Sequence, residues 1–271
     1  MNFYKELEHI IEECDVRAKL AHFFHFYKAY KNGTTAFEEQ YEKKVFLTPS
    51  YSKTCTIISP QDVPKRSNLS SAQGQINLLH AIAHIEFSAI DLALDAAYRF
   101  SDMPLAFYDD WLSVASDEVR HFLMLQELLE ELDASYGDLP VHNALFEALQ
   151  KTQTLTDRMA VVPRYLEANG LDATPMILEK LYKLPKSQML EKIITALETI
   201  LDEEIDHVKK GDFWFNYACK EENLSNAVYF QIIQKYYPQG FLRPKNLNIQ
   251  ARKEAGFSCS ELEFMAKKEL C

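Results

Sequence analysis

The sequence predicts an all-α protein built on a four-helix bundle, with additional helices toward its N- and C-terminal ends. Long segments show apolar residues at helical spacing, and glycine is scarce, at seven in 271 residues. Two of these segments each carry a Glu-x-x-His motif, Glu118–His121 and Glu204–His207. Paired motifs of this kind on separate helices are typical of four-helix bundles that hold metal ions between their helices.

The composition limits the classes of function. A formal net charge of −11 disfavours a broad nucleic-acid surface. The absence of an 18-residue apolar run predicts no membrane span. The N-terminus lacks the basic and apolar regions of a signal peptide, so we expect a cytoplasmic protein. The five cysteines are scattered and never spaced as Cys-x-x-Cys, which makes a thiolate metal site unlikely.

Residues 1–59 are predicted to form an N-terminal helical appendage and an arm. Apolar spacing over 3–31 predicts one or two helices. The β-branched and proline-containing stretch 45–64 predicts an extended arm, with a short strand at 54–59. His22 and His25 are three residues apart and suit a metal, but no carboxylate follows the same pattern. We therefore favour surface or packing roles for them.

Residues 60–271 are predicted to form the bundle and a C-terminal extension, beginning with a hairpin of helices over 72–100 and 104–133. The turn between these helices is short, which makes them antiparallel neighbours. Glu86 falls within the apolar stripe of the first helix. A buried carboxylate needs a partner. Metal ligation supplies one, and a salt bridge to Arg99 or to another helix is the alternative.

A connecting helix over 141–152 should lead to a second hairpin, formed by helices over 154–169 and 187–220. Pro163 is expected to kink or break the first of these helices. Asn169-Gly170 is expected to end it, and Thr174-Pro175 to start another helix. The C-terminal extension then contains helical spacing over 224–237 and a short helix from Ser258 or Ser260.

The Glu-x-x-His motifs predict a di-metal site. Residues i and i+3 of a helix lie about 60° apart around its axis and about 4.5 Å apart along it, so one carboxylate and one imidazole reach the same ion. A bundle completes such a site with one glutamate from each of two other helices. Glu86 precedes Glu118 by 32 residues, and Glu167 precedes Glu204 by 37. The six expected ligands are Glu86, Glu118, His121, Glu167, Glu204 and His207.

Three residues are candidates for positions just outside the ligands. Asp117 precedes a ligand glutamate and is either a hydrogen-bond partner of a ligand histidine or an exposed helical acid. His84 lies beside Glu86 along the chain and either supports the site or packs. Tyr165 either lines a pocket next to the metals or belongs to the core, as do Trp111 and Trp214.

Several segments together resemble a bacterial family of the ferritin-like superfamily, long catalogued as a domain of unknown function. The resemblance covers roughly residues 60–265 and rests on five segments, His80–Glu86, Asp117–His121, Val162–Asp172, Asp202–Val208 and Ala255–Ser258. It implies a ferritin-like bundle with a di-iron-type site and the same six ligands. It implies little about a substrate.

The function that we expect is that of a non-haem di-iron oxidase or hydroxylase, which uses O₂ on an unknown small organic molecule. Oxygen and nitrogen ligands suit iron, with manganese as the other option. A ferroxidase, peroxide-scavenging or iron-handling protein is the first alternative. A metal-free helical scaffold is the second. The electron donor and the oligomeric state do not follow from the sequence.

Overall fold

The computed structural model describes residues 1–38 and 41–270. The protein is all-helical, and no β-strand occurs within these two ranges. The chain divides into two compact units, Met1–Gln150 and Lys151–Cys271, which are described separately below. Each unit contains one of the long helical hairpins expected from the sequence.

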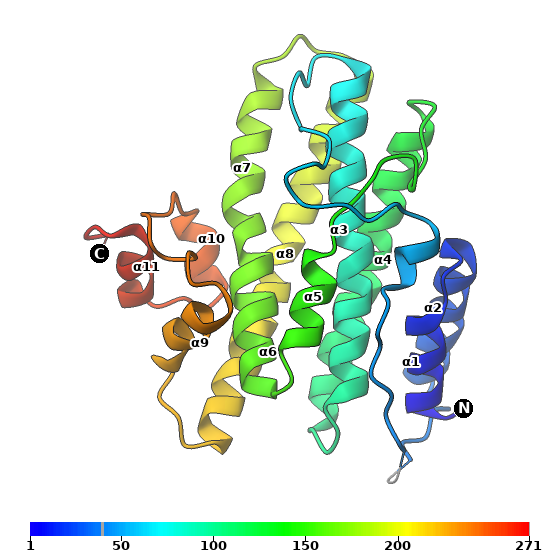
Figure 1. Cartoon of the computed structure of the whole chain (residues 1–271), viewed down its shortest axis with the longest axis vertical. Coiled ribbons are helices and arrows are strands. Elements are labelled where there is room, and N and C mark those ends of the chain that lie inside the picture. The colour runs from blue at the N-terminus through cyan, green and yellow to red at the C-terminus, as the bar shows by residue number, and fades with distance from the viewer. Residues whose placement is uncertain (39–40, 271) are drawn as a thin grey trace. The chain divides into compact units, whose positions relative to one another are not determined.

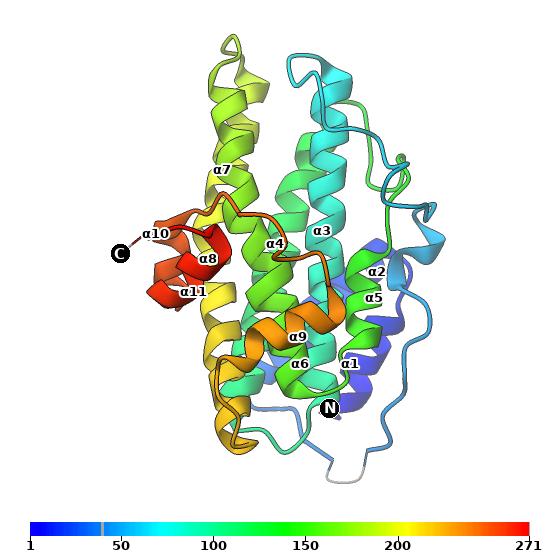
Figure 2. The ribbon, with the colours of Figure 1, turned by 60° about the vertical axis from the view of Figure 1, so that its left-hand side comes forward.

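The centre of the first unit is a hairpin of α3 (Ala72–Arg99) and α4 (Leu105–Glu130), which lie side by side in Figures 1 and 2. Ser71 caps α3 by accepting a hydrogen bond from the Gly74 amide at 3.1 Å. Most of α3 is buried. The two expected helices are thus confirmed within a few residues at each end.

Two N-terminal helices pack against this hairpin. They are α1 (Phe3–Glu12) and α2 (Val16–Lys31), and α1 contacts α3 while α2 contacts α4. Lys19 of α2 is fully buried, and its Nζ lies 2.5 Å from Asp91 Oδ1 of α3. The region 3–31 therefore forms two helices, and a buried ion pair joins the second of them to the centre of the unit.

The segment 45–64 contains a 3₁₀ turn, η1 (Ser50–Lys53), and no strand. At 54–59, where a short strand was expected, only Ile57 pairs, in an isolated parallel bridge with Val141. A single bridge cannot extend into a sheet here because the chain on either side has no further partner strand among the described residues. The unit closes with α5 (Ala144–Lys151), the expected connecting helix.

In the second unit, one helical run extends from Leu155 to Tyr182. It comprises α6 (Leu155–Val161), a π-helical segment η2 (Val162–Glu167) and α7 (Ala168–Tyr182). The expected end at Asn169-Gly170 and the new start at Thr174-Pro175 are therefore wrong, because Gly170 and Pro175 lie inside α7. Pro163 does disturb the helix as expected, and the disturbance takes the form of the π-helix.

The partner of this run is α8 (Gln188–Glu221), capped by Ser187, which accepts from the Leu190 amide. Three short helices follow, namely α9 (Val228–Tyr236), α10 (Ile249–Glu254) and α11 (Cys259–Ala266). Ser258 and Glu261 form a capping box at the start of α11. The expected helix from Ser258 or Ser260 is thus confirmed, and its cap is Ser258.

Within the described residues, one helix, α3, is long and apolar enough to cross a membrane by length and composition, and 78% of its most apolar window is buried inside the structure.

Candidate metal centre

The first unit brings together three of the six expected ligands, Glu86 of α3 and Glu118 and His121 of α4. One ligand atom from each lies within 4.8 Å of the others. His121 Nδ1 is 3.1 Å from Glu86 Oε2 and 3.8 Å from Glu118 Oε2. We call these three residues the first half-site. All are buried, with exposed fractions of 4%, 1% and 0% for Glu86, Glu118 and His121.

The alternative for Glu86 was a salt bridge to Arg99 or to another helix. Arg99 pairs with Asp95, one turn earlier on α3, through hydrogen bonds of 3.0 and 2.7 Å. Glu86 contacts the imidazole of His121 on the neighbouring helix α4.

The first half-site gathers two carboxyl groups and an imidazole in a buried position. Burial disfavours an imidazolium, but the neighbouring Glu118 and Glu86 outweigh it and raise the pKa of His121 to about 11. Carboxylate oxygens and imidazole nitrogens are ligands that transition metals accept, so the donor set fits a metal ion.

The second unit contains the other three expected ligands, which we call the second half-site. Glu204 and His207 lie one turn apart on α8, with His207 Nδ1 3.4 Å from Glu204 Oε1. The His207 ring is fully buried. Glu167 is the last residue of η2, and η2 packs against α8. Each Glu-x-x-His motif therefore presents a buried imidazole to the carboxylate of its own motif.

The π-helix that carries Glu167 fits closely against α8 at Gly211. A Cβ atom at Gly211 would lie 2.2 Å from Pro163 Cβ and 2.3 Å from Pro163 Cγ. Only glycine lets the two backbones approach this far. The close contact fixes the part of the chain that leads to Glu167.

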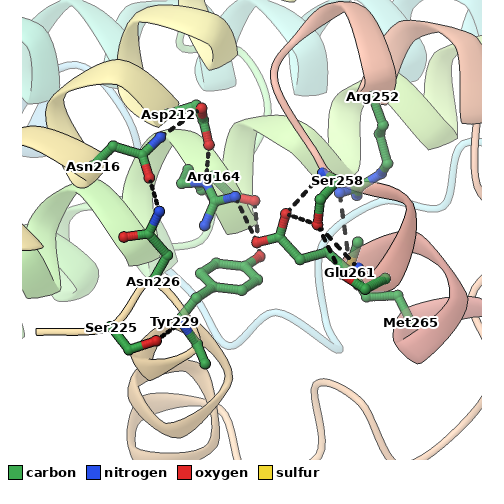
Figure 3. A network of polar contacts seen from close by, with 12 residues as sticks. Arg164, Asp212, Asn216, Ser225, Asn226, Tyr229, Arg252, Ser258, Glu261 and Met265 are labelled. Carbon is green, nitrogen blue, oxygen red and sulfur yellow. Dashed lines mark hydrogen bonds and ion pairs between the residues drawn. The ribbon is translucent and has the colours of Figure 1, made fainter.

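Arg164, also in η2, is held by two carboxylates, as Figure 3 shows. Its Nε lies 2.8 Å from Asp212 Oδ1 of α8, and its terminal nitrogen lies 2.8 Å from Glu261 Oε1 of α11. The guanidinium is 2% exposed and stacks against the rings of Phe215, Tyr229 and Phe257 at 4.4–4.8 Å. Burial raises the pKa of Asp212 even though Arg164 opposes the shift.

A second buried arginine holds the residues just after the π-helix. Arg252 of α10 makes hydrogen bonds of 2.9 and 2.7 Å to the two carboxylate oxygens of Asp172. It also donates to the Ala168 carbonyl at 2.9 Å. The sequence reasoning missed the buried ion pairs of Arg164. The available signal was a charged residue inside an apolar helical stretch, and such residues are seldom buried without a partner.

His84 is occupied away from the first half-site. Its Nε2 lies 2.8 Å from the His142 carbonyl, to which it donates, and its Nδ1 accepts from the Tyr136 hydroxyl at 3.1 Å. Burial lowers the pKa of His84 to about 4, so the ring is neutral.

Asp117 is partly exposed and its Oδ1 lies 3.0 Å from Arg120 of the same helix. Tyr165 is buried among rings of the C-terminal segment, at 5.0 Å from Tyr237 and 5.7 Å from Phe241. The Nζ of Lys245 lies 4.4 Å above the Tyr165 ring.

Trp111 lies on α4 two turns before Glu118, on the same helical face. It is 2% exposed, and its indole Nε1 has no hydrogen-bond partner among the described residues. Buried indole N–H groups usually have one.

A pocket of about 300 Å³ opens on the first unit beside α3. Its wall includes His80, His84, Lys65, Arg66 and His142, and it contains none of the six expected ligands. His80 accepts hydrogen bonds from the backbone amides of Gly137 and Leu139. The pocket is therefore a feature separate from the first half-site.

Comparison with known proteins places the chain in a family. A family model described as "Protein of unknown function (DUF455)" matches residues 12–263. The chain belongs to the DUF455 family. A relative from Haemophilus influenzae, named "Uncharacterized protein", is 40% identical over 222 residues, which cover 79% of this chain and 75% of the relative. No solved structure matches this DUF455 protein. The matched range spans the positions of all six expected ligands.

Proposed function

We propose that this DUF455 protein is a ferritin-like di-metal enzyme, an O₂-dependent oxidase or hydroxylase of a small organic molecule in the cytoplasm. In this proposal the hairpins of the two units join in one four-helix bundle, and the two half-sites together hold two metal ions. Iron is the proposed metal, with manganese as the other option, because both accept carboxylate and imidazole ligands.

One observation carries the proposal. In each unit the imidazole of the Glu-x-x-His motif is fully buried and faces the carboxylate of its own motif, at 3.8 Å in one case and 3.4 Å in the other. Two copies of the same donor pair, each with a buried imidazole and each on its own hairpin, are what a duplicated metal site requires. A scaffold without metal gains nothing from repeating an arrangement whose desolvation is costly.

The residues have distinct tasks in this proposal. Glu86, Glu118, Glu167 and Glu204 supply the negative charge that holds and neutralises the ions, while His121 and His207 each fix one ion. Two ferrous ions would supply the electrons that O₂ reduction needs. Fully buried neighbours of the first half-site, Phe87, Val119 and Phe122, keep bulk water away from it.

The proposed substrate is a small molecule. A net charge of −11 disfavours a bulky polyanion such as RNA. The unpartnered indole N–H of Trp111 is a donor that a polar group of a bound substrate would satisfy.

The test is to load the protein with Fe(II) without oxygen, admit O₂, and follow oxygen consumption, absorbance and the conversion of organic molecules in a metabolite pool. We expect oxygen consumption coupled to turnover of an organic compound. Replacing Glu118 by Gln should abolish it. Asp206→Asn is the matched control, because Asp206 adjoins His207 but is 59% exposed and pairs with Lys210.

Two results would contradict the proposal. Growth of iron mineral without turnover of any organic molecule would show an iron-handling protein. Exclusive binding of a metal without redox chemistry would rule out the oxidase.

A further inference from the structure

We infer that the turn between α1 and α2 carries a second metal site, formed by His9, Glu13 and His22, that binds a divalent transition ion such as Zn²⁺. One ligand atom from each of these side chains lies within 4.8 Å of the others. The imidazole rings of His9 and His22 are 4.8 Å apart between centroids. The site is confined to the first unit and does not depend on the function proposed above.

The helices place the three donors together for a simple reason. His9 and Glu13 are separated by four residues at the end of α1, so they lie on one side of that helix. The chain then turns at Asp15, which caps α2, and α2 carries His22 back beside His9. The sequence reasoning paired His22 with His25, but the structure pairs His22 with His9 across the two helices.

The carboxylate is held in place before any ion binds. Glu13 Oε1 accepts a hydrogen bond from the Asp15 amide at 2.9 Å. This bond orients the carboxylate and leaves its second oxygen for a metal. The site also lies at the C-terminal end of α1, where the partial negative charge of the helix favours a cation.

The distances suit tetrahedral coordination after small side-chain rotations. Zinc–nitrogen and zinc–oxygen bonds of about 2.0–2.2 Å place tetrahedral ligands about 3.4 Å apart. The ligand atoms now lie within 4.8 Å of one another. His9 and His22 are exposed, so their rings can rotate to bring these atoms to the tetrahedral separation without disturbing the core. Three protein ligands leave a fourth position for water.

The donor set differs from that of the two half-sites. Two imidazoles and one carboxylate favour Zn²⁺, Cu²⁺ or Ni²⁺, whereas the carboxylate-rich set of the bundle favours iron or manganese. The two kinds of site would therefore take different metals from a mixture.

The experiment titrates the full chain with Zn²⁺ by calorimetry and, separately, with Co²⁺ while its visible absorption is recorded. His22→Ala is compared with His25→Ala, an exposed histidine three residues later on α2 that is outside the cluster. Both variants are also made with Glu118→Gln, so that binding at the first half-site does not mask the result. Circular dichroism checks that each variant is folded.

We expect wild type and His25→Ala to bind one more ion than His22→Ala, and to melt at a higher temperature when Zn²⁺ is added. Glu13→Gln should weaken the binding of the same ion. Tetrahedral Co²⁺ bands should appear in wild type and disappear in His22→Ala. Equal stoichiometry and equal melting shifts in His22→Ala and His25→Ala would overturn the inference. Loss of the extra ion with unchanged iron uptake would leave the oxidase proposal untouched.

Discussion

His121 Nδ1 lies closer to Glu86, 35 residues away on α3, than to Glu118 of its own motif, at 3.1 Å against 3.8 Å. The motif therefore supplies only part of the ring's surroundings, and the antiparallel partner helix supplies the nearest carboxylate. Glu86 and the motif Glu118–His121 are separate signals in the sequence, and the contact between α3 and α4 brings them together in one half-site.

Replacing Glu118 and Glu204 by Ala should abolish iron uptake at the two half-sites and leave most of the helix content intact. Each substitution removes one carboxylate from one half-site. The measurement is iron analysis after loading with Fe(II) and dialysis, with circular dichroism for folding. Asp206→Asn should keep the wild-type stoichiometry. A double variant that still binds the full amount of metal would refute the ligand assignment.

Replacing Gly211 by Ala should destabilise the protein by about 1–3 kcal/mol, the usual effect of forcing extra atoms into a packed contact. The added methyl group would collide with Pro163. Gly170→Ala is the matched control, because Gly170 lies inside α7 with nothing within 4 Å of a new Cβ. The free energy of unfolding of the Gly170→Ala control should rise by about 0.5–1 kcal/mol. Urea denaturation measures the stability of both variants, and equal changes would contradict the close contact between Gly211 and Pro163.

Replacing Arg164 by Met should cost about 3–5 kcal/mol, since removing one partner leaves buried carboxylates uncompensated. Asp212 and Glu261 would both lose the guanidinium that they share. Lys183→Met removes an exposed ion pair with Glu179 and should change the urea midpoint little. If Arg164→Met unfolds at the same urea concentration as wild type, the ion-pair cluster does not stabilise this unit.

The protein should lose stability between about pH 6.5 and pH 4 partly through His80. Its Nε2 accepts two backbone hydrogen bonds, which require a neutral ring, and burial lowers the pKa of His80 to about 4. As the pH falls, the imidazole of His80 is protonated in the unfolded chain before it is protonated in the folded protein. The stability that neutral His80 contributes is therefore present above pH 6.5 and is lost as the pH falls to 4. One such group changes the free energy of unfolding by at most about 1.4 kcal/mol per pH unit.

The check is urea denaturation of wild type and His80→Gln at several pH values. Glutamine keeps an oxygen acceptor but has no proton to gain. The variant should therefore show a shallower fall in stability across this range. Identical pH profiles would show that His80 is not responsible.

The fold class and the long helices were predictable because apolar spacing, caps and short turns are local signals. Ser71 and Ser187 both cap the helices expected to begin near them. The first half-site was predictable for a related reason, because the i,i+3 spacing of Glu118 and His121 fixes their relative position on a helix.

The errors arose where distant contacts decide the structure. Gly170 and Pro175 look like a helix end and a helix start, but Arg252 and Asp172 tie this stretch to the C-terminal segment and the helix continues. The buried pair of Lys19 and Asp91 has no local sequence signal, because 72 residues separate its members. The approach of the His9 and His22 rings to 4.8 Å likewise depends on how α1 and α2 pack, and spacing along the chain does not reveal it.

The contact between Pro163 and Gly211 has an evolutionary consequence. While proline occupies position 163, no residue with a Cβ fits at position 211. A lineage must first replace Pro163 before it can change Gly211, and that first change would alter the helix leading to Glu167. The two positions should therefore vary together among DUF455 proteins, and the pair should be retained wherever Glu167 is retained.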